Sequence, residues 1–131
     1  MEPRVDGIVL GVEDLSRAKQ FYGEGLGWPV QQEQGDWVSF RSAEGSTPVA
    51  LFPLPALAED AGVPVEGSGF RGITLSHIVS SNDEVDAVMA QADRAGGTIA
   101  KAAGPAPWGG YSGHFADPDG HLWKVVARGT A

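Results

Sequence analysis

One order of apolar runs occurs twice in this sequence, and this repeat constrains the fold more than any other feature. Residues 5–12, VDGIVLGV, have the length and apolar character of a strand. Asp14 follows and can cap a helix that begins at Leu15 and ends near Gly25 and Gly27. Turn residues then separate three further runs that read as hairpin-connected strands: 28–33, 36–42 and 47–54.

The second half has the same order. Residues 72–80 are strand-like, and Asn82 can cap a helix whose apolar stripe includes Val85 and Met89. Three more strands are expected, at 97–102, 111–117 and 121–127. The segment 55–71 between the halves predicts a long connection with room for one helical turn. We therefore expect a single α+β domain over 1–131, with tandem βαβββ modules at about 1–54 and 72–131 that pack pseudo-symmetrically around a shared groove.

Composition excludes several functional classes. The 131 residues, 42% of them hydrophobic, suffice for a core, and the absence of cysteine excludes disulfides, thiolate metal sites and a cysteine nucleophile. The net charge of −8 would repel a phosphate backbone, so we expect no nucleic-acid partner. No apolar stretch approaches the roughly 18 residues of a membrane span, and no signal peptide is recognisable. These features predict a cytoplasmic protein without a membrane partner.

The two ends of the chain carry a family resemblance. The segments VDGIVLGVEDLSRAKQFYGEGLGW (5–28) and WGGYSGHFADPDGHLWKVV (108–126) resemble the vicinal oxygen chelate superfamily, which holds glyoxalase, extradiol dioxygenase and bleomycin-resistance proteins. The resemblance covers nearly the whole chain. It implies paired βαβββ modules whose curled mixed sheets surround a groove, and commonly a homodimer. In character the chain is closest to the metal-free, resistance-type binding branch.

The resemblance also says where a metal would be held. Enzymes of the superfamily bind a divalent metal through side chains of the first and fourth strands of each module. Those positions fall here on residues that are poor ligands: Gly7, Ala50, Thr74 and Lys124. The positive charge of Lys124 would also oppose a dication. We therefore expect neither a metal nor another cofactor.

The three histidines have different expectations. The register places His77 toward the helix layer in a structural role, although ligand contact stays open. His114 alternates with Ser112 on the predicted groove face, where it suits ligand contact, acid/base work or a plain surface role. His121 follows the turn Asp117-Pro118-Asp119-Gly120, so we expect a solvated histidine and structural aspartates.

The alternation of side chains along a strand also predicts which aromatic residues lie in the core and which lie on the groove face. Val38 and Phe40 are expected in the core, as are Phe115 and Trp123, which leaves Trp37 on the groove face. A glycine-rich segment brings further aromatics toward that face, where they suit a planar ligand, ordinary packing or a dimer seam. We assign no catalytic residue. The predicted ligand-binding residues are Trp37, Ser39, Arg41, Trp108, Tyr111, Ser112, His114 and Lys124.

Two functions are consistent with these expectations. The first is a metal-free protein that sequesters an aromatic or largely apolar natural product or antibiotic, working as a homodimer. The alternative is a glyoxalase- or dioxygenase-like enzyme, either with displaced metal ligands or with a metal-free mechanism that uses His114, Tyr111 or Lys124. An adaptor role is a third, less supported possibility. The fold alone does not distinguish between these three functions.

Overall fold

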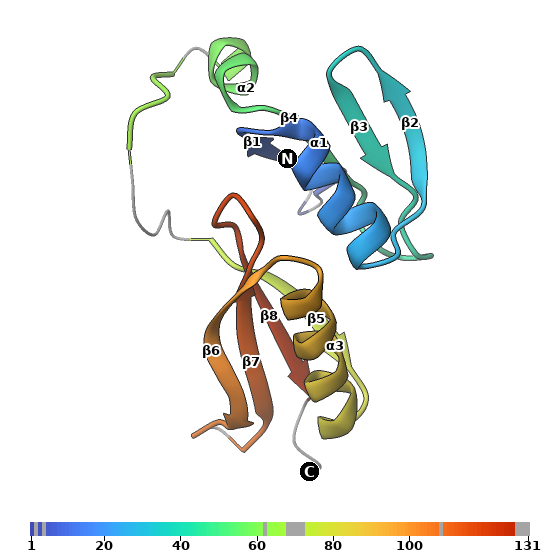
Figure 1. Cartoon of the computed structure of the whole chain (residues 1–131), viewed down its shortest axis with the longest axis vertical. Helices are drawn as coiled ribbons and strands as arrows, with labels where there is room; N and C mark the ends of the chain where they lie inside the picture. The colour runs from blue at the N-terminus through green and yellow to red at the C-terminus, as the bar shows by residue number, and fades with distance from the viewer. Residues whose placement is uncertain (2, 4, 62, 68–72, 108, 128–131) are drawn as a thin grey trace. The chain divides into compact units, whose positions relative to one another are not determined.

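The computed structural model describes residues 1, 3, 5–61, 63–67, 73–107 and 109–127. The chain forms two compact units, Met1–Ser68 and Gly69–Ala131, and each contains a four-stranded mixed sheet (Figure 1). The units repeat one arrangement, which confirms the predicted α+β class and the tandem βαβββ modules. None of the described helices is long and apolar enough to span a membrane.

Unit 1 has a sheet with the strand order β1-β4-β3-β2. Strand β1 runs parallel to β4, and the other neighbours are antiparallel. The elements of this unit are β1 (Ile8–Val12), α1 (Leu15–Lys19), the π-helix η1 (Gln20–Gly25), β2 (Val30–Gln34), β3 (Trp37–Phe40), β4 (Val49–Pro53) and α2 (Leu54–Ala61).

The core of unit 1 lies between α1–η1 and one face of the sheet. Asp14 caps α1 as predicted, because its carboxylate accepts a hydrogen bond from the Arg17 amide at 3.0 Å. Tyr22 of η1 is fully buried and contacts Phe40 of β3, with ring centroids 6.1 Å apart. The predicted core positions on β3 are confirmed, since Val38 and Phe40 are 3% and 1% exposed.

Helix α2 is longer than the single turn expected in the connection. The segment LPALAEDA is rich in the strong helix formers Leu and Ala, and Pro55 is tolerated because it lies in the first turn. The helix packs near β1: a Cβ atom added to Gly11 would lie 2.7 Å from Leu54 Cδ1 and 3.2 Å from Leu57 Cδ2. Since Gly11 alternates with Leu10 and Val12, α2 lies against the face of β1 opposite the core.

Unit 2 has a sheet with the order β5-β8-β7-β6, again with a parallel pair (β5 and β8) and two antiparallel pairs. Strand β6 is irregular, with register shifts between Ile99 and Lys101 and between Lys101 and Gly104. The elements of this unit are β5 (Leu75–Val79), α3 (Asn82–Arg94), β6 (Thr98–Pro105), β7 (Tyr111–Ala116) and β8 (Leu122–Ala127).

Helix α3 begins one residue earlier than predicted. Ser81, and not Asn82, is the cap: its hydroxyl accepts a hydrogen bond from the Glu84 amide at 3.1 Å. The Glu84 carboxylate in turn accepts hydrogen bonds from the hydroxyl and the amide of Ser80, and these bonds lower the pKa of Glu84. This reciprocal arrangement resembles a capping box and fixes the start of the helix.

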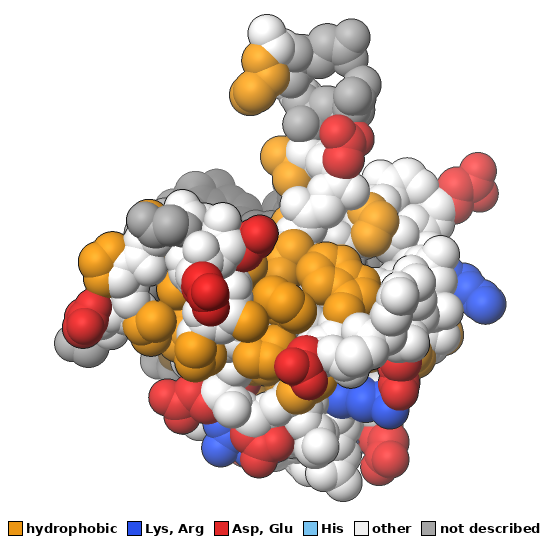
Figure 2. Space-filling model, turned by 90° about the horizontal axis from the view of Figure 1, so that it is seen from above, with side chains coloured by type: hydrophobic (Ala, Val, Ile, Leu, Met, Phe, Trp, Pro, Cys, Tyr) orange, Lys and Arg blue, Asp and Glu red, His pale blue; other side chains and the backbone are white. Residues whose placement is uncertain are grey.

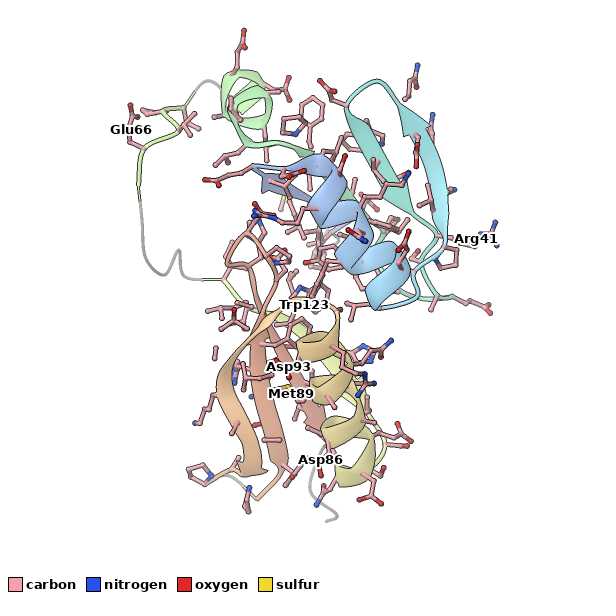
Figure 3. The ribbon with its side chains drawn as sticks, in the orientation of Figure 1. Arg41, Glu66, Asp86, Met89, Asp93 and Trp123 are labelled. Atoms are coloured by element: carbon pink, nitrogen blue, oxygen red, sulfur yellow. The ribbon has the colours of Figure 1, made fainter. Side chains whose placement is uncertain are left out.

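One face of the second sheet packs against α3. Met89 and Trp123 are buried between the helix and the strands (Figure 3). Phe115 is 2% exposed and stacks on Trp123 with 5° between the ring planes, which confirms both as core residues. Gly113 allows the helix to approach closely, because a Cβ atom there would lie 2.9 Å from Met89 Cε and 3.1 Å from the Ala103 backbone.

The turn between β7 and β8 has the structural role that the sequence predicts. Asp117 is buried, and its Oδ1 accepts hydrogen bonds from the Asp119 and His121 amides, both at 2.9 Å. Gly120 has φ +88°, a left-handed conformation that favours glycine. His121 is half-buried, less exposed than expected for a histidine that follows a turn.

Candidate functional site

Each sheet has a second face, opposite α1–η1 in unit 1 and opposite α3 in unit 2, which we call the distal face. Side chains alternate along a strand, so the buried core positions identify the residues of the distal face. In unit 2, Ser112, His114 and Lys124 alternate with the helix-facing Gly113, Phe115 and Trp123. In unit 1, Trp37, Ser39, Ala50 and Phe52 alternate with the core positions Val38, Phe40 and Leu51.

Four polar residues form a row across the distal face of unit 2, which we call the cationic row. The strand register pairs Ser76 with Lys124, Lys124 with His114, and His114 with Lys101. Neighbouring strands lie about 4.8 Å apart, so these side chains emerge side by side. The row contains two of the three lysines in the whole chain. A local concentration of positive charge therefore lies on an otherwise acidic protein.

His114 is at the centre of this row. Its Nδ1 atom is buried and has no hydrogen-bond partner among the described residues. Burial lowers the pKa of His114 below its usual value, and the positive charges of Lys124 and Lys101 lower this pKa further. The imidazole is therefore neutral at pH 7, with one ring nitrogen able to donate and the other able to accept a hydrogen bond.

The residues at the expected ligand positions do not fit a divalent metal. Gly7 offers no side chain, Ala50 is apolar, and Lys124 is a cation that lies beside His114, with Lys101 on the other side of that histidine. At the fourth position, Thr74 offers only a hydroxyl group as a possible ligand. Among the described residues, no group of three or more His, Asp or Glu side chains is placed to hold a metal ion. The donor set that the fold family uses is therefore replaced by apolar, hydroxyl and cationic groups.

The distal face of unit 1 is aromatic and apolar. The half-buried rings of Trp37 and Phe52 meet edge to face, with centroids 5.9 Å apart. Phe52 is paired with Gly11, and Leu54 and Leu57 of α2 lie against that glycine. Hydrophobic side chains also gather on the side of the molecule that Figure 2 shows from above, with acidic side chains at the margin of this area.

Ser39 lies beside this aromatic pair on the same face. It is paired with Ala50, which is paired with Val9, so this row of unit 1 corresponds to the cationic row of unit 2. Val9 and Ala50 hold the places that Ser76 and Lys124 hold in the second unit. The two repeats thus carry different chemistry at equivalent positions, one neutral and one cationic.

Two predicted ligand-binding residues, Arg41 and Tyr111, lie away from the distal faces. Arg41 is exposed just beyond the end of β3, and Figure 3 shows its side chain extending outward. Tyr111 has the parity of Gly113 and therefore lies on the α3 side, where its hydroxyl donates a 2.7 Å hydrogen bond to Asp86 of that helix. The pKa of Tyr111 is raised chiefly by this hydrogen bond. Trp108 lies outside the described residues.

His77 lies on the face of the sheet that the sequence predicts, toward α3, but its side chain is not buried there. It is paired with Val125, a core residue on the α3 side, yet its own side chain is exposed. The reason is its position in β5, which is an outer strand of the sheet.

Lys101 and Phe52 are distal-face residues that sequence reasoning missed. Lys101 was not identified because β6 contains two register shifts, and each shift interrupts the alternation from which a face is predicted. Phe52 was missed although a signal exists: it is two residues from Ala50 in β4 and therefore shares its face.

Comparisons with known proteins relate these features to a family. The sequence model of the Glyoxalase/Bleomycin resistance protein/Dioxygenase superfamily matches residues 4–125. A glyoxalase-related enzyme from Fulvimarina pelagi is 33% identical, with a TM-score of 0.85 over 96% of this chain and 88% of that protein. No curated protein matches the chain.

Two further crystal structures share the fold. A glyoxalase/bleomycin resistance protein/dioxygenase from Nocardioides is 21% identical, with a TM-score of 0.82 over 100% of this chain and 87% of that one. A lactoylglutathione lyase from Agrobacterium tumefaciens is 20% identical, with a TM-score of 0.71 over 95% of this chain and 93% of that one.

Proposed function

Because this chain belongs to the Glyoxalase/Bleomycin resistance protein/Dioxygenase superfamily, we propose that it is a member that binds a small molecule without a metal. The observation that carries the proposal is Lys124. Its cationic side chain holds the position where the resemblance expects an acidic metal ligand, and Lys101 adds a second positive charge across His114. Both charges oppose a dication, so this member depends on binding surfaces and not on coordination.

The distal face of unit 1 supports an aromatic or largely apolar ligand. Trp37 and Phe52 are half-buried, so each ring contacts its neighbour and still offers surface to a bound molecule. Aromatic pairs add about 0.5–1.5 kcal/mol beyond the area that they bury. A planar natural product or antibiotic fits this chemistry, and the protein would protect the cell by sequestering it.

A second candidate function is catalysis. Two of the similar structures are described as a glyoxalase-related enzyme and a lactoylglutathione lyase. His114 gives this alternative a chemical basis, because a neutral imidazole beside two ammonium groups can act as a general base. The two proposals differ in one observable: a sequestered compound is recovered unchanged, whereas a substrate is not.

We also propose that the protein forms a homodimer. Strands β1 and β5 are each one of the two outer strands of their sheet, and each carries an exposed apolar side chain: Val9 is 37% and Ile78 is 53% exposed. Outer strands with apolar side chains favour pairing with another chain. Sedimentation equilibrium tests this proposal, and a monomeric mass at micromolar concentration together with full ligand binding would contradict it.

Calorimetric titration against a panel of aromatic antibiotics tests the binding proposal. Trp37→Ala removes both the edge-to-face contact and apolar area worth roughly 25 cal/mol per Å², so we expect at least about tenfold weaker binding. Trp37→Phe keeps an aromatic ring and serves as the matched control, with a smaller loss. Equal affinity for the wild type and Trp37→Ala would contradict a ligand surface at Trp37.

A further inference from the structure

We propose that the cationic row of unit 2 binds an oxyanion, namely the carboxylate or phosphate group of a small molecule. The inference rests on the proposed function and deepens it by naming the chemical class of the ligand. The groups that would contact the oxyanion are Lys101, His114 and Lys124, from three neighbouring strands.

The charge distribution of the chain supports an anionic ligand. Asp and Glu outnumber Lys and Arg by 17 to 9, and yet two of the three lysines lie on either side of one histidine. Lys101 and Lys124 lie two strand spacings apart with His114 between them, and their like charges repel each other. An anion held between the two ammonium groups is attracted by both, so the arrangement favours a bound anion.

The geometry suits a single small anion. Lys101 and Lys124 are each adjacent to His114, so their backbones are separated by two strand spacings, or about 9.6 Å. Lysine side chains are long and flexible enough to converge over the histidine from both sides. They would donate charge-assisted hydrogen bonds, which are stronger than bonds between neutral groups.

The buried Nδ1 atom of His114 is the second and independent observation. A buried polar atom without a partner is uncommon and calls for an explanation. Rotation of the imidazole about χ2 would turn this nitrogen toward the row, where, in the tautomer that carries its proton on Nδ1, it would donate a hydrogen bond to an oxyanion oxygen. The same ligand would thus contact the histidine and both lysines.

Proton linkage provides a specific readout. The charges that lower the pKa of His114 come from the strands on both sides of it, Lys124 in β8 and Lys101 in β6. An oxyanion bound between them offsets both charges and therefore raises the pKa of His114. Binding should accordingly be accompanied by proton uptake when the pH is close to that pKa.

The experiment is an NMR titration of the three imidazoles in the full chain, with inorganic phosphate and acetate as probes and chloride at equal ionic strength as the reference. We expect a saturable shift of the His114 resonances and a raised pKa at this residue alone, with His77 and His121 unchanged. The probe that saturates at the lower concentration distinguishes a phosphate site from a carboxylate site. Shifts that do not saturate, or that are equal at all three histidines, would overturn the proposal.

Three lysine variants provide the matched comparison. Lys101→Gln and Lys124→Gln should each weaken phosphate or acetate binding at least about threefold, since each removes one charge-assisted hydrogen bond. Lys19→Gln is the control, because Lys19 lies in unit 1 and forms an ion pair with Glu33. Equal weakening by all three variants would overturn the proposal, because it would indicate an effect of net charge.

A pair of matched aromatic probes separates this inference from the proposed function. We expect 2-naphthoate to bind more tightly than the neutral 2-naphthamide, and Lys124→Gln to remove the difference. Equal affinity for the two probes in the wild type would overturn the oxyanion site and leave the aromatic binding proposal standing. Saturable phosphate binding at His114 with no binding of either naphthalene compound would support the oxyanion site and contradict the aromatic surface.

Discussion

Replacing Gly113 by alanine should destabilise unit 2, and the size of the effect follows from the space around the residue. The added Cβ atom would lie 2.9 Å from Met89 Cε and 3.1 Å from both the Cα and the amide nitrogen of Ala103. The methionine side chain can move aside, but the backbone of β6 cannot move without disturbing the sheet. Overpacking of this kind costs about 1–3 kcal/mol.

Thermal and urea denaturation measure this cost. For a chain of this size, each kcal/mol lowers Tm by about 3–5 °C. Gly104→Ala is the matched control, because Gly104 lies in the neighbouring strand with no atom within 4 Å of an added Cβ atom. We expect that control to be neutral or stabilised by about 0.4–1 kcal/mol, through reduced entropy of the unfolded chain.

The Gly113 result bears directly on the functional site. Gly113 and His114 are consecutive in β7, so their side chains lie on opposite faces of the sheet. Because α3 approaches the sheet closely at Gly113, His114 lies on the distal face. A Gly113→Ala protein as stable as the wild type would refute this assignment of faces. The cationic row would then lose the register argument on which it rests.

Three further predictions concern capping, the turn and pH. Ser81→Ala should cost about 1 kcal/mol of unfolding free energy and Asn82→Ala much less, because Ser81 is the cap; equal losses in urea denaturation would contradict this. Asp117→Ala should lower the free energy of unfolding by about 1–3 kcal/mol, since two backbone amides lose their acceptor. A decrease in Tm smaller than that of Ser81→Ala would contradict this prediction. The lowered pKa of His114 means that the unfolded chain binds more protons below about pH 6.5, so stability falls as the pH is lowered from there. Lys124→Gln removes one cause of the lowered pKa and should lessen that fall, as measured by Tm against pH.

Much of the fold was predictable because side-chain alternation is local. Val38 and Phe40 on β3, and Phe115 and Trp123 around the turn, were assigned to the core from parity alone, and all four are buried. The helix that begins after Asp14 was predicted from its cap and its apolar stripe. These features depend on residues a few positions apart, so a single sequence contains the information.

The features that sequence reasoning missed depend on contacts between distant segments. Lys101 joins the cationic row through a strand with two register shifts, and no local pattern predicts where a shift occurs. Tyr111 was placed near the ligand because it follows a glycine-rich segment, yet its hydroxyl bonds Asp86, 25 residues away. Ser81 and Asn82 are both good caps, and the backbone conformation at Ser81, with φ −144° and ψ 160°, decides between them.

The central claim is that this protein binds its small molecule without a metal, and one measurement tests it most directly. The purified protein is analysed for transition metals, titrated with 2-naphthoate in the presence and absence of a chelator, and the compound is then recovered. We predict less than stoichiometric metal, the same affinity in both titrations, and chemically unchanged 2-naphthoate. One tightly held metal ion per chain, with an affinity that is lost when the chelator removes it, would contradict the claim.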